Sequence, residues 1–183
     1  MIQATTVSTE EELRQIIGLQ RRNLKQHITQ EEKDAQGFLT MEFGMPMIQQ
    51  LHDLAPSIII KDDDKVVAFA IVVLQEGRKF YTDLEPMFRN FETLEWKNKP
   101  LKEYSFYVMG QVCIDKDYRG KGLFDKLYHK HRDIYKDRFD FIITEISTSN
   151  YRSLRAHQRV GFETINTFRD KLDEWDVVIW NWN

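Results

Sequence analysis

YVMGQVCIDKDYRGKGLFDKLY, residues 107–128, is the stretch around which the rest of the chain is organised. Its first part, Tyr107 to Ile114, is rich in aromatic and β-branched residues, so it predicts a buried strand that a charged turn then ends. From Leu123 onward, apolar side chains recur with the three-and-four spacing of a helix that has one face in a core. Between strand and helix lies a short basic loop with two glycines, Gly120 and Gly122.

This loop, Arg119-Gly120-Lys121-Gly122, has a physical reason to bind phosphate. Glycine adopts positive φ angles and lets the backbone approach a ligand closely, so consecutive N–H groups can converge on an anion. The start of the following helix adds unpaired N–H groups, and Arg119 and Lys121 add full charges. A diphosphate is the expected ligand. Many tight turns between strand and helix contain glycine without binding anything, so both interpretations stay open on this stretch alone.

The composition bounds the class of protein. A chain of 183 residues, with 42% hydrophobic and 30% charged residues, predicts a single globular domain over residues 1–183. The net charge of -3 gives no basic field for nucleic acid or an anionic membrane, so we expect neither as a partner.

Cysteine usage and hydropathy predict where the protein works. The single cysteine, Cys113, falls in the predicted strand, which excludes a disulfide framework and favours a reducing compartment. The N-terminus lacks the apolar run of a secretory signal, and the longest apolar run, Val66 to Leu74, is far shorter than the ~18 residues that span a membrane. We therefore expect a cytoplasmic location.

The remaining chain predicts alternating strands and helices. Thr9 with Glu12, and Thr29 with Glu32, have the spacing of capping boxes that open helices. Strands are expected at 2–7, 58–61, 66–75, 107–114, 141–146, 162–169 and 175–182, and helices after residue 9 and at 30–36, 46–54, 85–94, 122–138 and 150–160. This order indicates a mixed α/β domain with helices flanking a sheet. An aromatic-rich insertion after residue 75 is expected to pack on the surface of the core.

Two separated segments resemble motifs of the GNAT superfamily, the acetyl-coenzyme A-dependent N-acetyltransferases. The phosphate loop of that family has Gln or Arg, then Gly three residues later, then Gly or Ala two residues after that. Arg119 to Phe124 matches this pattern, except that Phe124 stands where a small residue is usual. The second motif begins with Asn, has Ala or Ser at the third position after it and Tyr or His at the seventh, and closes with Gly-Phe. Asn150 to Phe162 matches it throughout.

The resemblance implies both a fold and an activity. The fold is a central mixed, mostly antiparallel sheet of six to seven strands, splayed between its two central strands and flanked by helices on both faces. The activity is direct transfer of an acetyl group from acetyl-coenzyme A, as cosubstrate, to a primary amine of a small molecule or peptide in a ternary complex. Variable segments, about 24–57 and about 76–103, would hold the acceptor.

Two further expectations accompany this reading. The alternative function is a non-catalytic module that binds or senses coenzyme A or an acyl-coenzyme A, because Phe124 departs from the pattern and no base is evident. A homodimer that pairs the tryptophan-rich end, residues 175–183, is compatible with the sequence, as is packing of these rings on the core.

The resemblance also implies a set of cofactor-binding residues. Main-chain groups of the predicted strand would hold the pantetheine arm, and an N–H near Val112 or Cys113 would stabilise the oxyanion. The thiol of Cys113 itself is expected to pack in the core. Asn150 would contact the pantetheine amide, cap the next helix, or do both. The full set is Val112, Cys113, Ile114, Arg119, Gly120, Lys121, Gly122, Leu123, Phe124, Asn150 and Ser153.

Two side chains are candidates for catalysis. His157 occupies the position that the family places close to the thioester sulfur, which implies a proton donor to the departing thiolate. An ordinary packed or surface histidine is the other interpretation. Glu145, in a predicted strand beside the splay, is the candidate general base. It could instead face solvent or pair with Arg152 or Arg155, and Tyr107 or ordered water could serve as the base in its place.

No metal site is expected. His129 and His131 are two residues apart in a predicted helix, so they lie on different faces and do not form a ligand pair.

Overall fold

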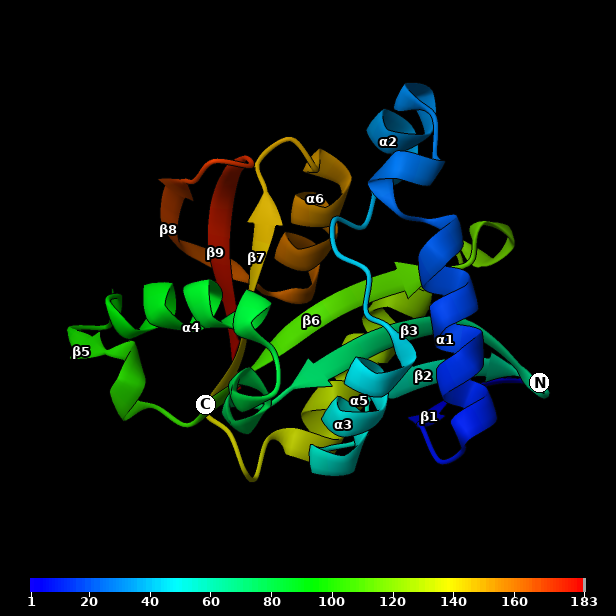
Figure 1. Ribbon diagram of the computed structural model, residues 1–183, viewed down its shortest axis with the longest axis horizontal. Coiled ribbons are helices and arrows are strands. Elements are labelled where there is room, and N and C mark those ends of the chain that lie inside the picture. The colour runs from blue at the N-terminus through cyan, green and yellow to red at the C-terminus, as the bar shows by residue number, and fades with distance from the viewer. Residues whose placement is uncertain (183) are drawn as a thin grey trace.

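The computed structural model describes residues 1–182, which form a seven-stranded sheet with helices on both faces (Figure 1). The strands, in spatial order, are β1 (Ile2–Thr6), β2 (Ile58–Asp62), β3 (Lys65–Val73), β6 (Phe106–Ile114), β7 (Phe141–Ser147), β9 (Glu174–Asn181) and β8 (Glu163–Arg169). The central pair β6 and β7 is parallel, and the other neighbours are antiparallel. This confirms the expected mixed, mostly antiparallel sheet.

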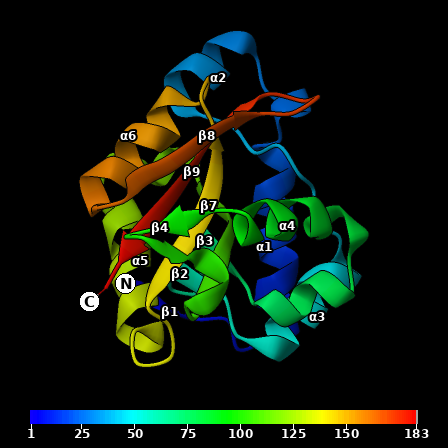
Figure 2. The ribbon, with the colours of Figure 1, turned by 90° about the vertical axis from the view of Figure 1, so that its left-hand side faces the viewer.

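Helices cover the two faces of the sheet, as the view in Figure 2 shows. They are α1 (Glu10–Arg22), α2 (Gln30–Gln36), α3 (Met45–Leu54), α4 (Glu85–Glu92), α5 (Leu123–Tyr135) and α6 (Tyr151–Val160). Buried side chains of α1, α3 and α4 share one core cluster, and those of α5 and α6 share the cluster on the opposite face. Within residues 1–182, no helix has the length and apolar character needed to cross a bilayer.

The predicted caps set the helix starts. In α1 the Thr9 hydroxyl accepts from the main-chain N–H of Glu12 at 3.2 Å, and the Glu12 carboxylate accepts from the N–H of Thr9 at 3.1 Å. The same reciprocal pair, Thr29 with Glu32, opens α2. Gly37 ends α2 with a φ of +75°, a left-handed angle that glycine adopts without strain.

The two central strands separate partway along their length. They pair in parallel from Phe106 with Phe141 to Val108 with Ile143. Beyond these pairs the Thr144 hydroxyl donates to the main-chain oxygen of Met109 at 2.8 Å. β6 continues to Ile114 against β3, and β7 continues to Ser147 against β9, so each strand keeps its outer neighbour while a gap opens between them. This is the splay that the sequence resemblance implied.

The insertion between β3 and β6 packs against the core, as expected, and buries aromatic side chains of its own there. Its helix α4 buries Phe88 and Phe91, and the Phe91 ring meets Phe106 of β6 edge to face with centroids 6.4 Å apart. The insertion also contains a short hairpin, β4 (Glu95–Trp96) and β5 (Lys99–Pro100), that the sequence did not predict, because each strand is only two residues long. The insertion is therefore fixed to the sheet.

The tryptophan-rich C-terminal segment packs on the core. Trp180 is 7% exposed, and its ring lies 5.9 Å from that of Phe162. The last residue of this segment, Asn183, lies outside the described residues. Pairing of the segment across a dimer stays a prediction.

Truncation of Phe91 is expected to destabilise the whole domain. Phe91→Ala removes a fully buried ring, so the free energy of unfolding should fall by about 3–5 kcal/mol. Phe80→Ala, in the same insertion but at a side chain that is 47% exposed, should cost less than about 1 kcal/mol. Urea unfolding of both variants measures the difference, and equal effects would contradict the assignment of the insertion to the core.

Candidate active site

A cavity of about 740 Å³ opens where β6 and β7 separate. The end of β6, the loop 119–122, the first turns of α5 and α6, and residues 34–39 form its walls. The structure brings the residues that the sequence marked for cofactor binding together on these walls, with the exception of Lys121: Val112, Cys113, Ile114, Arg119, Gly120, Gly122, Leu123, Phe124, Asn150 and Ser153. Their individual roles in binding stay predictions.

The glycine loop has the geometry of an anion cradle. Gly120 and Gly122 have φ angles of +74° and +71°, and a Cβ atom added at either would meet no atom within 4 Å. These positions therefore favour glycine through the backbone angle and leave open space where a ligand could approach. Gly122 is also the N-cap of α5 and supplies no side-chain cap, so the first-turn N–H groups of the helix are available to an anion.

The two cations of the loop have different orientations. Arg119 Nε donates to the main-chain oxygen of Ile114 at 3.0 Å, and its two terminal nitrogens donate to Asn23 Oδ1 at 2.7 Å and to Gln36 Oε1 at 3.1 Å. The Arg119 guanidinium therefore lies on the cavity wall. Its hydrogen bonds connect the loop to β6 and to the chain between the end of α1 and the end of α2. Lys121 instead folds back, and its ammonium donates to the main-chain oxygen of Asp117, in the turn that precedes the loop, at 2.9 Å.

A strap, defined as residues 37–43, closes one side of the cavity. Asn150 Nδ2 donates to the main-chain oxygen of Phe38 at 3.2 Å, and the Gln111 side chain donates to that of Met41. In Figure 1 the chain from α2 into the strap runs beside α6 and across the front of β6. Sequence reasoning missed these contacts because they join residues far apart in the chain and have no periodic signal.

Asn150 combines a cap with a contact to the strap. Its Oδ1 accepts from the main-chain N–H of Ser153 at 3.4 Å, which caps α6, and its side chain is 8% exposed. A Cβ atom on Gly37 would lie 2.8 Å from that oxygen, so the strap passes too close for a larger residue there. The helix-cap interpretation of Asn150 therefore matches the structure, and a contact with a ligand stays a prediction.

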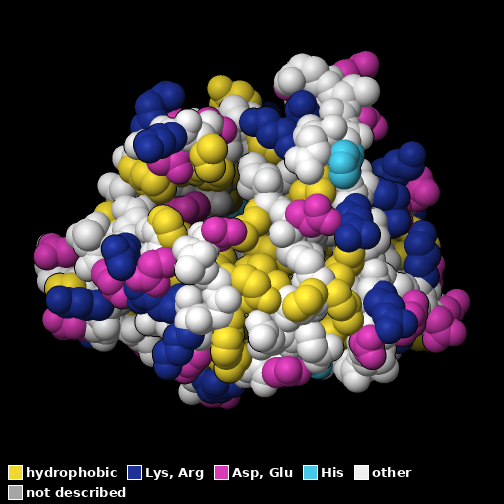
Figure 3. All heavy atoms as spheres, in the orientation of Figure 1, with side chains coloured by type: hydrophobic (Ala, Val, Ile, Leu, Met, Phe, Trp, Pro, Cys, Tyr) yellow, Lys and Arg dark blue, Asp and Glu magenta, His cyan; other side chains and the backbone are white. Residues whose placement is uncertain are grey.

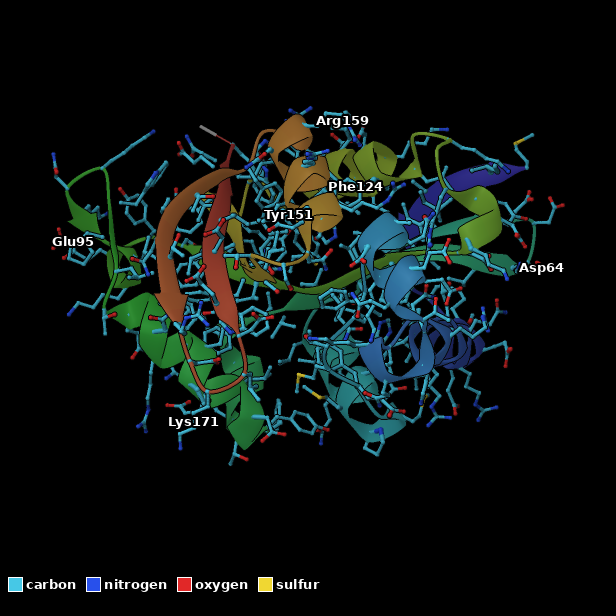
Figure 4. The ribbon with its side chains drawn as sticks, turned by 90° about the horizontal axis from the view of Figure 1, so that it is seen from above. Asp64, Glu95, Phe124, Tyr151, Arg159 and Lys171 are labelled. Carbon is cyan, nitrogen blue, oxygen red and sulfur yellow. The ribbon has the colours of Figure 1, made fainter. Side chains whose placement is uncertain are left out.

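Phe124, the departure from the family pattern, packs against α6. Its ring lies 4.9 Å from that of Tyr128 and 5.0 Å edge-on to that of His157, and Figure 4 shows it at the start of α5, near the helix that carries Tyr151 and Arg159. The larger residue is accommodated between α5 and α6 by these ring contacts. One wall of the cavity is consequently aromatic.

Glu145 lies one residue past the contact that marks the separation of β6 and β7. Asn90 Nδ2 donates to its Oε1 at 3.1 Å. Burial raises the pKa of Glu145 to about 7; the Asn90 hydrogen bond opposes this rise and the charge of Asp170 adds to it. A carboxyl that changes its charge near neutral pH suits a general base. Arg152 and Arg155, considered as partners from the sequence, line the cavity instead.

The side of the sheet that Glu145 faces is hollowed. Figure 3 shows hydrophobic side chains gathered in the middle of the face that carries α1, α3 and α4, with acidic side chains beside a hollow near β7. The partly buried hydrophobic residues on this face include Met41, Met45 and Tyr81. An acceptor that reaches Glu145 from here would meet apolar side chains before the carboxyl.

His157 lies in the packed layer between α5 and α6 and is 1% exposed. Its Nδ1 lies 2.8 Å from the main-chain oxygen of Ser153, which can only accept, so Nδ1 carries the proton. Nε2 therefore accepts from the Tyr128 hydroxyl at 2.5 Å. Burial lowers the pKa of His157 to about 4, so the ring is neutral near pH 7. This placement favours packing, and the proton-donor role stays a prediction.

Two other groups considered from the sequence, the Tyr107 hydroxyl and the Cys113 thiol, have surroundings that do not favour a part in the chemistry. Tyr107 is fully buried, and its hydroxyl bonds to His131 Nδ1 at 2.9 Å. Cys113 is on the cavity wall, but burial raises the pKa of its thiol to about 12, which makes it a poor nucleophile. Within the part of the chain that the structure describes, no cluster of three or more His, Cys, Asp or Glu could hold a metal ion.

Comparison with known proteins places this geometry among acetyltransferases. Residues 11–162 match the model of the acetyltransferase (GNAT) family. A search of curated proteins finds no match. Among solved structures, the ribosomal-protein-S18-alanine N-acetyltransferase from Escherichia coli superposes with a TM-score of 0.66 at 13% identity, covering 99% of this chain and 94% of that chain.

Two other similar structures were solved with a bound ligand. The NatC complex bound to Gag peptide and CoA gives a TM-score of 0.67 at 14% identity, covering 100% of this chain and 99% of that chain. A Salmonella typhimurium protein with its cofactor acetyl-CoA gives 0.64 at 11% identity, with 100% and 95% covered. At these identities the similarity establishes the fold.

Gly120→Val is expected to weaken coenzyme A binding by about 10- to 100-fold, because a β-branched residue at positive φ costs about 1–3 kcal/mol and distorts the loop. Lys121→Met is the matched control, since the Lys121 ammonium is bonded to the main-chain oxygen of Asp117, and its affinity should stay within about threefold of wild type. Isothermal titration with coenzyme A measures both. Normal binding by Gly120→Val would contradict the anion-cradle assignment.

His157→Phe separates packing from proton donation. The substitution leaves the Tyr128 hydroxyl buried without its partner, so the free energy of unfolding should fall by about 1–3 kcal/mol. Turnover per folded molecule should stay within about threefold, because the ring does not line the cavity. Chemical unfolding and acetyl-transfer rates give the two values. A loss of about 10- to 1000-fold in turnover at unchanged stability would instead establish the acid role.

Proposed function

The chain belongs to the acetyltransferase (GNAT) family, and from this premise we propose that it transfers an acetyl group from acetyl-coenzyme A to a primary amine of a small molecule or a peptide. The observation that carries the proposal is one juxtaposition. The glycine loop and residues 112–114, which lie beyond the last β6–β7 pair, line one cavity, and the half-buried carboxyl of Glu145 lies on β7 one residue past the Thr144 contact that marks this separation.

The residues present fit acetyl-coenzyme A as the cosubstrate. The diphosphate would lie on the loop 119–122 and the first turn of α5, where N–H groups converge beside open space. The pantetheine arm would run along Val112 to Ile114, whose edge toward β7 has no strand beside it. Two of the similar structures were solved with CoA or acetyl-CoA, which supports this choice.

The chemistry begins with the acceptor, which reaches the site as an ammonium. Glu145 in its ionised form takes one of the three ammonium protons, and the freed lone pair of the nitrogen attacks the thioester carbonyl carbon. Negative charge then develops on the carbonyl oxygen, near the main-chain N–H groups of Val112 and Cys113, which would stabilise it.

Collapse of this intermediate breaks the bond between carbon and sulfur. The second nitrogen proton passes to the departing sulfur, and the third remains on the amide nitrogen. The products are the acetylated amine, coenzyme A as its thiol, and a proton on Glu145 that returns to solvent. Each proton is accounted for without a contribution from His157, in keeping with its neutral, packed state.

An acceptor screen tests the proposed function. The protein is incubated with acetyl-coenzyme A and a panel of peptides with free N-termini, polyamines and amino acids, and mass spectrometry detects a gain of one acetyl group while a thiol reagent detects released coenzyme A. Acetylation of at least one amine supports the proposal. Tight coenzyme A binding with no turnover across the panel would favour the non-catalytic binding module.

Substitution of Glu145 should remove most of the activity. Glu145→Gln keeps the shape of the side chain but cannot accept a proton, so kcat should fall by about 10²- to 10⁴-fold while the affinity for coenzyme A is unchanged. Glu10→Gln is the control, because that carboxylate pairs with Arg14 at 2.5 Å on the exposed surface of α1, and it should retain wild-type rates.

The wild-type pH profile should follow the charge of Glu145. The pKa of this carboxyl is raised to about 7, so below that value it is protonated and kcat/KM should rise about tenfold per pH unit, then level off above it. A profile flat between pH 5 and 8 would contradict Glu145 as the base.

A further inference from the structure

Asn90 connects the insertion to the proposed base. The two residues are 55 positions apart, and Asn90 Nδ2 donates to Glu145 Oε1 at 3.1 Å. Within residues 1–182 this is the side-chain hydrogen bond recorded for the Glu145 carboxyl, so Oε2 is left for another donor. The contact lies on the face of the sheet that α4 covers, opposite the layer of α5 and α6.

The helix holds Asn90 in a defined place. Phe88 and Phe91, on either side of it in the sequence, are 1% and 0% exposed, and their rings contact each other edge to face at 6.4 Å. The Thr93 hydroxyl donates to the main-chain oxygen of Asn90 at 2.7 Å, which closes the last turn of α4. Buried packing therefore holds the backbone of Asn90 in place, and its half-buried side chain extends from there to Glu145.

The neighbouring strands offer Glu145 no positive charge. On β9 the residue opposite it is Val177, and on β6 the last residue paired with β7 is Val108, both apolar and buried. The turn between β8 and β9 contributes Asp170, whose charge disfavours ionisation of Glu145. Burial among these elements and the charge of Asp170 therefore both favour the protonated form of the Glu145 carboxyl.

The two arginines of the insertion are engaged with other carboxylates. Arg89, next to Asn90 in α4, donates to Glu85 Oε1 at 2.9 Å, and Arg78 donates to Glu85 Oε2 at 2.8 Å. The contact that α4 makes with the Glu145 carboxyl is therefore a hydrogen bond from the neutral amide of Asn90. A hydrogen bond from an amide modestly favours the ionised form of the Glu145 carboxyl. An adjacent arginine would instead lower the basicity of that carboxyl strongly, and without any donor the carboxyl would be protonated at neutral pH.

We propose that Asn90 is a positioning residue for acetyl transfer, which keeps the Glu145 carboxylate charged and oriented so that Oε2 receives the proton of the acceptor amine. This inference rests on the proposed function, because it assigns Asn90 a role toward the base named there. It also gives the insertion a part in the chemistry in addition to its part in the core.

Asn90→Leu tests the inference, since leucine has a similar size and no donor. The rising limb of kcat/KM against pH should move up by about one pH unit, which makes kcat/KM about tenfold lower at pH 6 and close to wild type at pH 9. Asn90→Asp, which places a like charge beside Glu145, should move the limb further in the same direction. Arg89→Gln is the matched control, because it removes a neighbouring contact to Glu85 and should leave the limb in place.

A readout independent of activity separates this inference from the proposed function. In protein labelled with ¹³C at the glutamate carboxyl, the resonance missing from Glu145→Gln identifies Glu145, and its titration midpoint should be higher in Asn90→Leu than in wild type. An unchanged midpoint in both Asn90 variants would overturn the inference. If the midpoint rises but the pH profile of the rate does not move, the positioning role of Asn90 in acetyl transfer is wrong. That result would also count against Glu145 as the base, although the hydrogen bond between the two residues would still affect the Glu145 pKa.

Discussion

The separation of β6 from β7 is the constraint on which the rest of the structure depends. Each strand remains paired with its outer neighbour, so the gap between them cannot close without breaking one side of the sheet. Main-chain N–H and C=O groups along the gap need partners, and an extended amide-containing ligand supplies them at the spacing of a strand. Thr144, bonded to Met109 O, marks where strand pairing ends and where the proposed pantetheine site would begin.

Most of the fold could be predicted from patterns of residues that are close together in the chain. The capping boxes at Thr9 and Thr29, the glycine loop and the apolar spacing of α5 are each set by residues close in the chain, so their geometry could be predicted from sequence. The lining of the cavity followed because two motifs, at Arg119 and Asn150, meet across the gap. Contacts such as Asn90 with Glu145 could not be predicted, because nothing periodic links residues in separate elements.

Side-chain direction was the other limit of sequence reasoning. Lys121 and His157 each occupy the expected position, yet one folds back on the turn before its loop and the other is buried against Tyr128. In both cases a neighbouring group decides the orientation: a free main-chain oxygen for the lysine, and a buried hydroxyl that needs an acceptor for the histidine. The orientation of Phe124 is likewise set by neighbours distant in the chain, since its ring packs edge-on against that of His157.

The sheet also divides the molecule into two compartments. Residues that would handle the cofactor come from the loop 119–122 and the starts of α5 and α6, while Glu145 and the insertion lie on the face that α4 covers. Under the proposed function, changes in the insertion would alter which amine is accepted without disturbing the phosphate cradle. A partition of this kind would let one half of the domain stay constant while the other half changes with the acceptor.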